Sequence, residues 1–246
     1  MCTLVLAWQV FADTPVAVAA NRDEAVDRPS VAPERIDGDP AIVAPRDEEA
    51  GGTWIGYNEH GVLVAITNRW IEADLAGERS RGLLVRDALE HDSAEAAARF
   101  VEREIREYEF DGFNLAIADA NAAVLLEWDG QLAVQNLSPG VHVVVNVGAD
   151  GDYVIPSVRP EAGEAQAENA TAVRTALQPE PGEASEDWLE RAADVVSDHD
   201  YGVCIHRDGF GTRSSSLITI GEGGPTYRFA PGPPCETRYR TVEGQF

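Results

Sequence analysis

Apolar residues along the chain gather in short runs, and several runs alternate with polar residues at every second position. Runs of about four to eight residues, bounded by Gly, Pro, Asn or Asp, are typical of β-strands. The pattern therefore predicts strands at residues 4–10, 16–20, 62–67, 114–118, 123–128, 132–135, 141–146, 201–205 and 216–220.

A helical period replaces the two-residue period in two regions of the chain. The first covers residues 80–91 and, after a new N-cap at Asp92, residues 92–109. The apolar stripe of its second part consists of Ala97, Val101, Ile105 and Tyr108. This spacing predicts two consecutive helices that each bury one face.

The second helical region covers residues 165–177 and 185–197, which the proline- and glycine-rich QPEPGE separates. In its later helix, Trp188, Ala192 and Val195 share a face, which indicates core packing. The stretch 153–169 is rich in proline, glutamate, alanine and glycine, which predicts a mobile surface loop.

Strands grouped in runs, with helices in pairs between them, argue against strict β-α alternation. The order fits an α+β fold in which two sheets are covered by two helical layers. No internal repeat and no long linker is present, so we expect a single domain over residues 1–246, with 150–190 as a variable loop and helical region.

The charge of the chain is extreme, with 43 acidic residues against 19 basic ones and a net charge of −24. All 19 are arginines, and the acids are spread along the whole length. This pattern predicts a halophilic protein with an acidic surface, whose repulsion is screened in concentrated salt. A chain without a basic patch is not expected to bind nucleic acid.

Neither a membrane span nor a secretory signal is predicted. No uninterrupted apolar stretch reaches the roughly 18 residues that a spanning helix needs, and the N-terminus lacks a basic region before its apolar run. An apolar fraction of 44% is ample for a folded core. We therefore expect a cytoplasmic protein.

A cysteine stands directly behind Met1, and the buried-strand pattern TLVLAW follows it. If Met1 is removed, Cys2 offers a thiol nucleophile beside a free α-amine that can act as its base. The other cysteines, Cys204 and Cys235, show no CxxC spacing, and the total is odd. Cys204 reads as an inert core residue and Cys235 receives no role, so neither a disulfide framework nor a metal site is predicted.

Asparagine, glycine and charged residues cluster at the ends of four predicted strands, in AANRDE, GGTWIGYNEHGVLVAITN, PGVHVVVN and DGFGTRSSSLITI. Asn68 and Asn146 each end an apolar strand, where an amide suits an oxyanion donor; an ordinary turn residue is the alternative. The five histidines are scattered without a ligand spacing. No cofactor is predicted.

Several motifs in order, MC, AANRDE, RPS, GGTWIG, TN, RG, GFN, GFGTRS and ETR, resemble the NRDE family, also called the transport-and-Golgi-organisation family. This resemblance covers nearly the whole chain. The family in turn is similar to N-terminal nucleophile hydrolases that cleave conjugated bile acids and penicillin-type amides. The resemblance implies a four-layer αββα sandwich.

The resemblance also implies roles for individual residues. Cys2 would be the nucleophile, Asp23 would orient its thiol and amine, and Asn68 and Asn146 would donate to the oxyanion. Residues expected to bind substrate are Arg22, Arg213, Asn21 and Trp54.

Two functions follow, and the choice between enzyme and carrier stays open. The first is a cysteine amidohydrolase or acyltransferase acting on a small intracellular amide or (thio)ester. The second is a non-enzymatic carrier or trafficking protein for haem or lipid-derived metabolites on the same fold, with His60 or His142 as a candidate haem ligand. The sequence predicts neither the substrate nor the oligomeric state.

Overall fold

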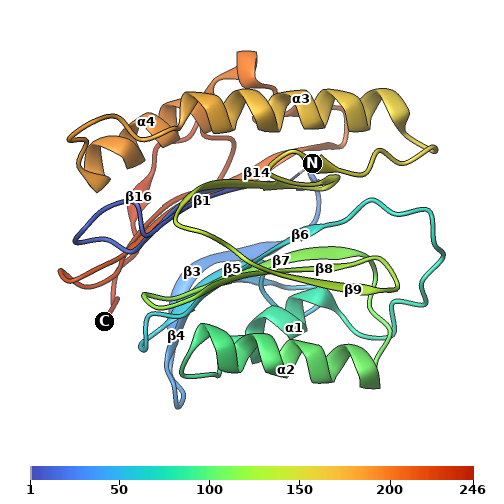
Figure 1. The fold of residues 1–246 in the computed structure, drawn as a ribbon, viewed down its shortest axis with the longest axis horizontal. Helices are drawn as coiled ribbons and strands as arrows, with labels where there is room; N and C mark the ends of the chain where they lie inside the picture. The colour runs from blue at the N-terminus through green and yellow to red at the C-terminus, as the bar shows by residue number, and fades with distance from the viewer. Residues whose placement is uncertain (1) are drawn as a thin grey trace. The chain divides into compact units, whose positions relative to one another are not determined.

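The computed structural model describes residues 2–246 and divides them into two compact units (Figure 1). The first unit is built from the chain up to Arg28 together with Pro139–Val242. The second unit is built from Pro29–Ser138 and Glu243–Phe246. Each unit consists of one antiparallel sheet and a pair of helices, as the grouping of the apolar runs predicts.

The sheet of the first unit has the strand order β12-β11-β10-β1-β2-β14-β15-β16, with β13 paired to β14. All six residues of β1 and seven of the ten residues of β2 are buried. The strands are β1 (Thr3–Trp8), β2 (Val16–Ala25), β10 (Gly140–Val145), β11 (Gly148–Ala149), β12 (Asp152–Tyr153), β13 (His206–Arg207), β14 (Phe210–Ile220), β15 (Thr226–Ala230) and β16 (Arg240–Thr241).

Two helices, α3 (Pro160–Ala176) and α4 (Ser185–Ser197), lie across one face of this sheet (Figure 1). A 3-10 turn, η1 (His199–Tyr201), follows α4. Trp188 is fully buried and donates from its indole nitrogen to the Leu177 carbonyl at 2.9 Å. Ala192 and Val195 are buried beside it, which confirms that this helix face is core.

The sheet of the second unit runs β3-β4-β5-β6-β7-β8-β9. Its strands are β3 (Ser30–Ile36), β4 (Ile42–Asp47), β5 (Ile55–Asn58), β6 (Leu63–Asn68), β7 (Phe113–Ala118), β8 (Ala123–Trp128) and β9 (Leu132–Asn136). Helices α1 (Arg81–Ala88) and α2 (Ala94–Glu107) cover it (Figure 1). Leu84, Val101, Phe113 and Leu115 belong to the continuous apolar core between these helices and the sheet.

Most of the predicted strands are confirmed, but one is wrong. Residues 201–205 begin in η1 and continue without regular structure, because Gly202 turns the chain with a left-handed φ of 63°. Strands β3, β4, β5 and β15 were not predicted. Strands β3 and β4 each contain a proline, which interrupts their two-residue period. Strand β15 follows a glycine-rich turn, and its own period is too short to stand out beside it.

Three further boundaries differ from the prediction. Strand β2 continues through AANRDE to Ala25, so this motif lies within the sheet. Helix α2 takes its N-cap from Ser93 in place of Asp92, because the Ser93 hydroxyl accepts from the amide of Ala96. Helix α3 begins at Pro160, inside the stretch 153–169 predicted as a loop. Over the described residues, no helix combines the length and apolar character needed to cross a membrane.

Candidate active site

Cys2 lies immediately before β1, and the backbone of β2 runs alongside it. Thr3 pairs with Asn21, so the same register places Cys2 opposite Arg22. The backbone nitrogen of Cys2 donates to Asn146 Oδ1 at 3.0 Å. The Cys2 thiol points to the backbone carbonyl of Asp23, with 3.7 Å between sulfur and oxygen. Three of the predicted residues therefore meet at the start of the chain.

Asn146 follows the last residue of β10 and is almost fully buried. Its Oδ1 accepts a second hydrogen bond, at 3.0 Å, from Nε2 of Gln166 on α3. Gln166 itself is 2% exposed, which fixes the amide of Asn146 from the helix side. The sequence did not reveal Gln166, because its neighbours in EAGEAQAENA carry no motif.

Asp23 directs its carboxylate to Thr212 on the neighbouring strand β14. Thr212 donates from Oγ1 to Asp23 Oδ1 at 2.6 Å and accepts, at the same oxygen, from the Ile205 amide at 2.9 Å. Burial raises the pKa of Asp23 to about 6, although the hydrogen bond from Thr212 acts in the opposite direction. Thr212 stands next to the predicted Arg213 and was missed.

The surroundings of Cys2 disfavour the thiolate form of its side chain. Burial raises the pKa of Cys2 above its ordinary value, and the nearby charge of Asp23 raises it further. The Arg22 charge and the hydrogen bond to the Asp23 backbone lower the same pKa. Since burial is the largest of these effects, the thiol needs a base before it can act as a nucleophile.

The side chains of the NRDE motif alternate between the two faces of β2. Asn21 points toward α4, where its amide donates to the carbonyls of Val196 and Val203 at 2.8 and 2.9 Å. Asp23 shares that face, while Arg22 points to the opposite one. The Arg22 guanidinium lies 3.7 Å from Glu24 Oε2. Arg22 thus lies on the same sheet face as Cys2, whereas the donors of Asn21 serve to anchor the chain.

Arg213 sits in an irregularity of the sheet. Thr212 pairs with Asp23 and Ser214 pairs with Arg22, so Arg213 is the extra residue of a β-bulge in β14. Bulges redirect side chains and are frequent beside active sites. The Arg213 Nε atom is buried and has no hydrogen-bond partner among the described residues.

The remaining two predicted residues, Asn68 and Trp54, belong to the second unit, and their roles stay predictions. Asn68 is the exposed last residue of β6. On the neighbouring strand β7, Asn114 donates to the Thr67 hydroxyl at 3.2 Å and accepts from Arg69 at 2.7 Å. Arg69 also forms an ion pair with Glu127. This polar network holds the end of β6 against β7 and β8.

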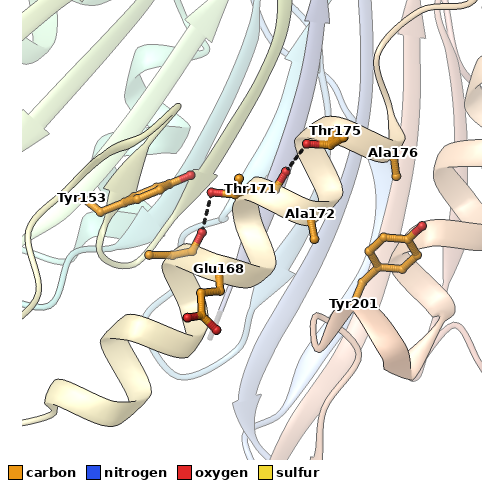
Figure 2. Close-up of a pocket in the computed structure, with 8 residues that line it drawn as sticks. Tyr153, Glu168, Thr171, Ala172, Thr175, Ala176 and Tyr201 are labelled. Atoms are coloured by element: carbon orange, nitrogen blue, oxygen red, sulfur yellow. Dashed lines mark hydrogen bonds between the residues drawn. The ribbon is translucent and has the colours of Figure 1, made fainter.

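A separate hollow lies along the outer side of α3 (Figure 2). Tyr153 and Tyr201 stand on either side of it, and the hydroxyls of Thr171 and Thr175 are turned back to helix carbonyls. No residue predicted for the active site is among its lining residues. The hollow therefore supports no role in the predicted chemistry.

The family profile "Transport and Golgi organisation 2" matches residues 1–230. The chain belongs to this family. The human Transport and Golgi organization protein 2 homolog is 25% identical over 240 residues, which are 84% of this chain and 82% of that protein. The mouse Transport and Golgi organization 2 homolog is 32% identical over 109 residues, covering 43% and 39% of the two chains.

Two solved structures resemble the molecule at low sequence identity. Penicillin V acylase from Agrobacterium tumefaciens has a TM-score of 0.58 at 15% identity, covering 94% of this chain and 83% of that one. The Caenorhabditis elegans N-acylethanolamine-hydrolyzing acid amidase ortholog has a TM-score of 0.60 at 13% identity, covering 88% and 92%. These likenesses confirm the predicted α+β fold of the N-terminal nucleophile hydrolase type.

Several family motifs turn out to be packing devices. The backbone of Gly52 in GGTW lies so close to Gly82 that a Cβ at Gly52 would stand 2.1 Å from the Gly82 carbonyl carbon. Thr53 donates to the Gly82 carbonyl at 3.0 Å. Arg81 donates to the carbonyl of Gly112 in GFN at 2.7 Å. The partner of Gly52 in this close approach is backbone of the same unit.

Proposed function

We propose that this protein is a cysteine-dependent N-terminal nucleophile amidohydrolase or acyltransferase that acts on a small amide or (thio)ester. The observation that carries the proposal is the 3.0 Å hydrogen bond between the Cys2 nitrogen and Asn146 Oδ1. That nitrogen becomes the α-amine once Met1 is removed, and Met1 lies outside the described residues. A buried amide that holds this atom beside the thiol gives the nucleophile and its base one fixed geometry.

In the proposed acylation step, the uncharged α-amine takes the thiol proton and the sulfur attacks the substrate carbonyl carbon. A C–S bond forms and the carbonyl electron pair moves to oxygen. Asn146 supports this step with its NH2 group, since its oxygen accepts from Cys2 and Gln166. The intermediate collapses with cleavage of the substrate's C–N, C–O or C–S bond for an amide, ester or thioester, and the ammonium returns its proton to the leaving group.

Deacylation reverses these roles. Water, or an amine acceptor, attacks the thioester and gives its proton to the α-amine, after which the C–S bond breaks and the thiol is restored. No cofactor is required by this scheme. Asp23, neutral or charged around its pKa of about 6, holds the backbone beside the thiol through its bond with Thr212.

Substrate binding is proposed for Arg213, the bulged residue of β14, and for Arg22 on the neighbouring strand β2. Arg22 lies on the same sheet face as the thiol, and Arg213 carries a buried, unsatisfied Nε among the described atoms. Guanidinium groups bind carboxylates in a bidentate manner, which supports an acyl donor or a leaving group that carries a carboxylate. For Asn68 and Trp54 we retain the proposed roles of oxyanion donor and substrate contact. For Asn21 we propose an anchoring role, because its amide donates to the carbonyls of Val196 and Val203.

The experiment compares three forms of the protein against a panel of small amide, ester and thioester substrates. Wild type should lack the mass of Met1 and turn over at least one substrate, and Cys2→Ala should be inactive with an unchanged circular dichroism spectrum. A form with glutamine inserted between Met1 and Cys2 retains the thiol but not the free amine, and it should be equally inactive. Turnover by this form or by Cys2→Ala would overturn the mechanism.

The second candidate is a carrier for haem or lipid-derived metabolites, which the word "transport" in the name of the human relative supports. His142 is buried, and its Nδ1 is bound to Asp150. His60 lies exposed in the turn between β5 and β6. Haem titration separates the candidates: stoichiometric binding that His60→Ala abolishes, without turnover by wild type, would favour the carrier.

A further inference from the structure

Outside the candidate active site, four side chains of the first unit form a compact donor cluster. His199, Cys204, His206 and Cys235 each present one nitrogen or sulfur atom, and these four atoms lie within 4.8 Å of one another. The residues come from three separate segments: η1, the chain leading into and including β13, and the turn after β15. We call these four residues the Cys2His2 cluster, and we propose that it binds one Zn²⁺ ion.

The distances within the cluster approach those of a tetrahedral zinc site. Cys204 Sγ lies 3.4 Å from Cys235 Sγ, and His206 Nε2 lies 3.1 Å from Cys235 Sγ and 3.8 Å from Cys204 Sγ. With Zn–S bonds of about 2.3 Å and Zn–N bonds of about 2.0 Å, tetrahedral donors stand about 3.3 to 3.8 Å apart. Small side-chain rotations therefore bring the donors onto one ion.

The orientation of the two imidazole rings also suits the binding of one ion. The rings of His199 and His206 are stacked, with centroids 5.2 Å apart and planes inclined by 16°. Stacked, nearly parallel rings can present their nitrogens to the same side. Both histidines and Cys235 are exposed, so an ion can reach them from solvent. Cys204 is buried and would be the innermost of the four ligands.

The donor set selects the metal. Two thiolates and two imidazoles suit zinc, whereas calcium and magnesium require oxygen ligands. Binding releases the two thiol protons to solvent, and the two thiolates then neutralise the double charge of the ion. Four protein donors complete the tetrahedron and leave no position for a reacting water, so the site is structural.

The alternative use of the two cysteines is a disulfide. A sulfur–sulfur bond is about 2.05 Å long, and the observed 3.4 Å separation shows two free thiols. Forming the bond would also require an oxidant and would leave both histidines without a role. The sequence prediction of no metal site rested on local ligand spacing. Such spacing does not register this cluster, because Cys235 follows His206 by 29 positions.

The proposed metal would fix the chain that leads to Asp23. Cys204 precedes Ile205, whose amide donates to Thr212 Oγ1 at 2.9 Å and whose carbonyl accepts from the Thr212 amide at 2.8 Å. Thr212 in turn donates to Asp23. Asn21 on β2 also donates a hydrogen bond to the carbonyl of Val203, the residue before Cys204. The ion would therefore tie the surface segments to the sheet at the position of Asp23.

The test measures metal content on the whole chain, purified in concentrated potassium chloride with a reductant and then desalted. Wild type should hold one zinc per chain, and replacement by Co²⁺ should give intense tetrahedral d–d bands with a thiolate charge-transfer band. Cys235→Ala and His206→Ala, both at exposed positions, should lose the metal and these bands. Chelation of wild type should lower the melting temperature, because the ion binds only the folded state.

Two controls separate this site from the proposed catalysis. Cys2→Ala and His60→Ala remove a thiol and an imidazole outside the Cys2His2 cluster, and both should retain one zinc. The proposal is overturned if wild type and Cys235→Ala hold equal zinc, or if wild type contains no zinc and a peptide map shows Cys204 cross-linked to Cys235. Neither outcome depends on whether the protein turns over a substrate.

Discussion

At the scale of single residues, the candidate active site is made of buried polar groups. Asp23 is 4% exposed, and its carboxylate accepts a hydrogen bond from the Thr212 hydroxyl. The same face of β2 carries Asn21, whose two donors are directed to carbonyls. A charged carboxylate in such a place is costly, which is why the pKa of Asp23 rises to about 6.

This shift predicts a pH dependence of stability. The folded pKa of Asp23 lies above its ordinary value of 3.8, so between these two pH values the folded state binds the proton more tightly than the unfolded chain. Its contribution to stability is therefore present below pH 4 and is lost as the pH rises through about 6. Asp23→Asn has no carboxylate to ionise at this position, so it avoids this loss. Its free energy of unfolding should therefore rise by about 2 to 3 kcal/mol relative to that of wild type as the pH increases over this range.

Chemical denaturation of both proteins at pH 4, 5, 6 and 7 in constant salt measures the difference. Asp27→Asn, at an exposed position two residues after the end of β2, is the matched control and should track wild type. A free-energy difference between Asp23→Asn and wild type that stays constant from pH 4 to pH 7 would contradict the shift.

At the scale of elements, glycines decide how close two backbones come. The GGTW turn and the start of α1 meet at Gly52 and Gly82, where Thr53 donates to the Gly82 carbonyl. A side chain at Gly52 would meet backbone, which cannot rotate away as a flexible side chain can. The glycine therefore couples the loop before β5 to the first helix of the second unit.

Gly52→Ala should destabilise the protein by about 3 kcal/mol, at the upper end of the range for overpacking, since the added Cβ would lie 2.1 Å from a backbone carbon. Gly223→Ala is the control, because a Cβ there meets no atom within 4 Å. Thermal unfolding of the three proteins in the same salt measures the effect. Equal melting temperatures for Gly52→Ala and Gly223→Ala would show that the contact carries no strain.

At the scale of the whole molecule, charge is the dominant feature. A net charge of −24 with 43 acidic residues and no lysine creates self-repulsion that the fold must overcome. In molar salt the Debye length falls to about 3 Å, so most of this repulsion is screened. We propose on this basis that the protein is adapted to concentrated salt.

The melting temperature should therefore rise steeply with potassium chloride, and dialysis into dilute buffer should cost cooperative unfolding or helical signal. Circular dichroism melts over a salt series measure both. Sucrose at matched osmolarity is the control, because it does not screen charge. A melting temperature that is independent of salt would contradict the halophilic interpretation.

The sequence by itself determined most of the elements and the family of this protein. Apolar runs located β1, β6, β7, β8 and β10, because each of these strands consists mostly of consecutive apolar residues. The local order of motifs identified Cys2, Asp23 and Asn146 as candidates, and the structure brings these three together. Strands β3 and β4 were not predicted because a proline interrupts each of them, and β5 was not predicted because it has only four residues.

Tertiary structure alone decided what lies beside these residues. Gln166 and Thr212 reach the candidate site from a distant helix and strand, across sequence separations of 20 and 189 positions. The Cys2His2 cluster forms in the same way, since folding brings Cys235 to within 3.4 Å of Cys204 across 31 positions. Local propensity acts over a few residues. Such contacts depend on strand order and register, and these cannot be predicted from a short motif.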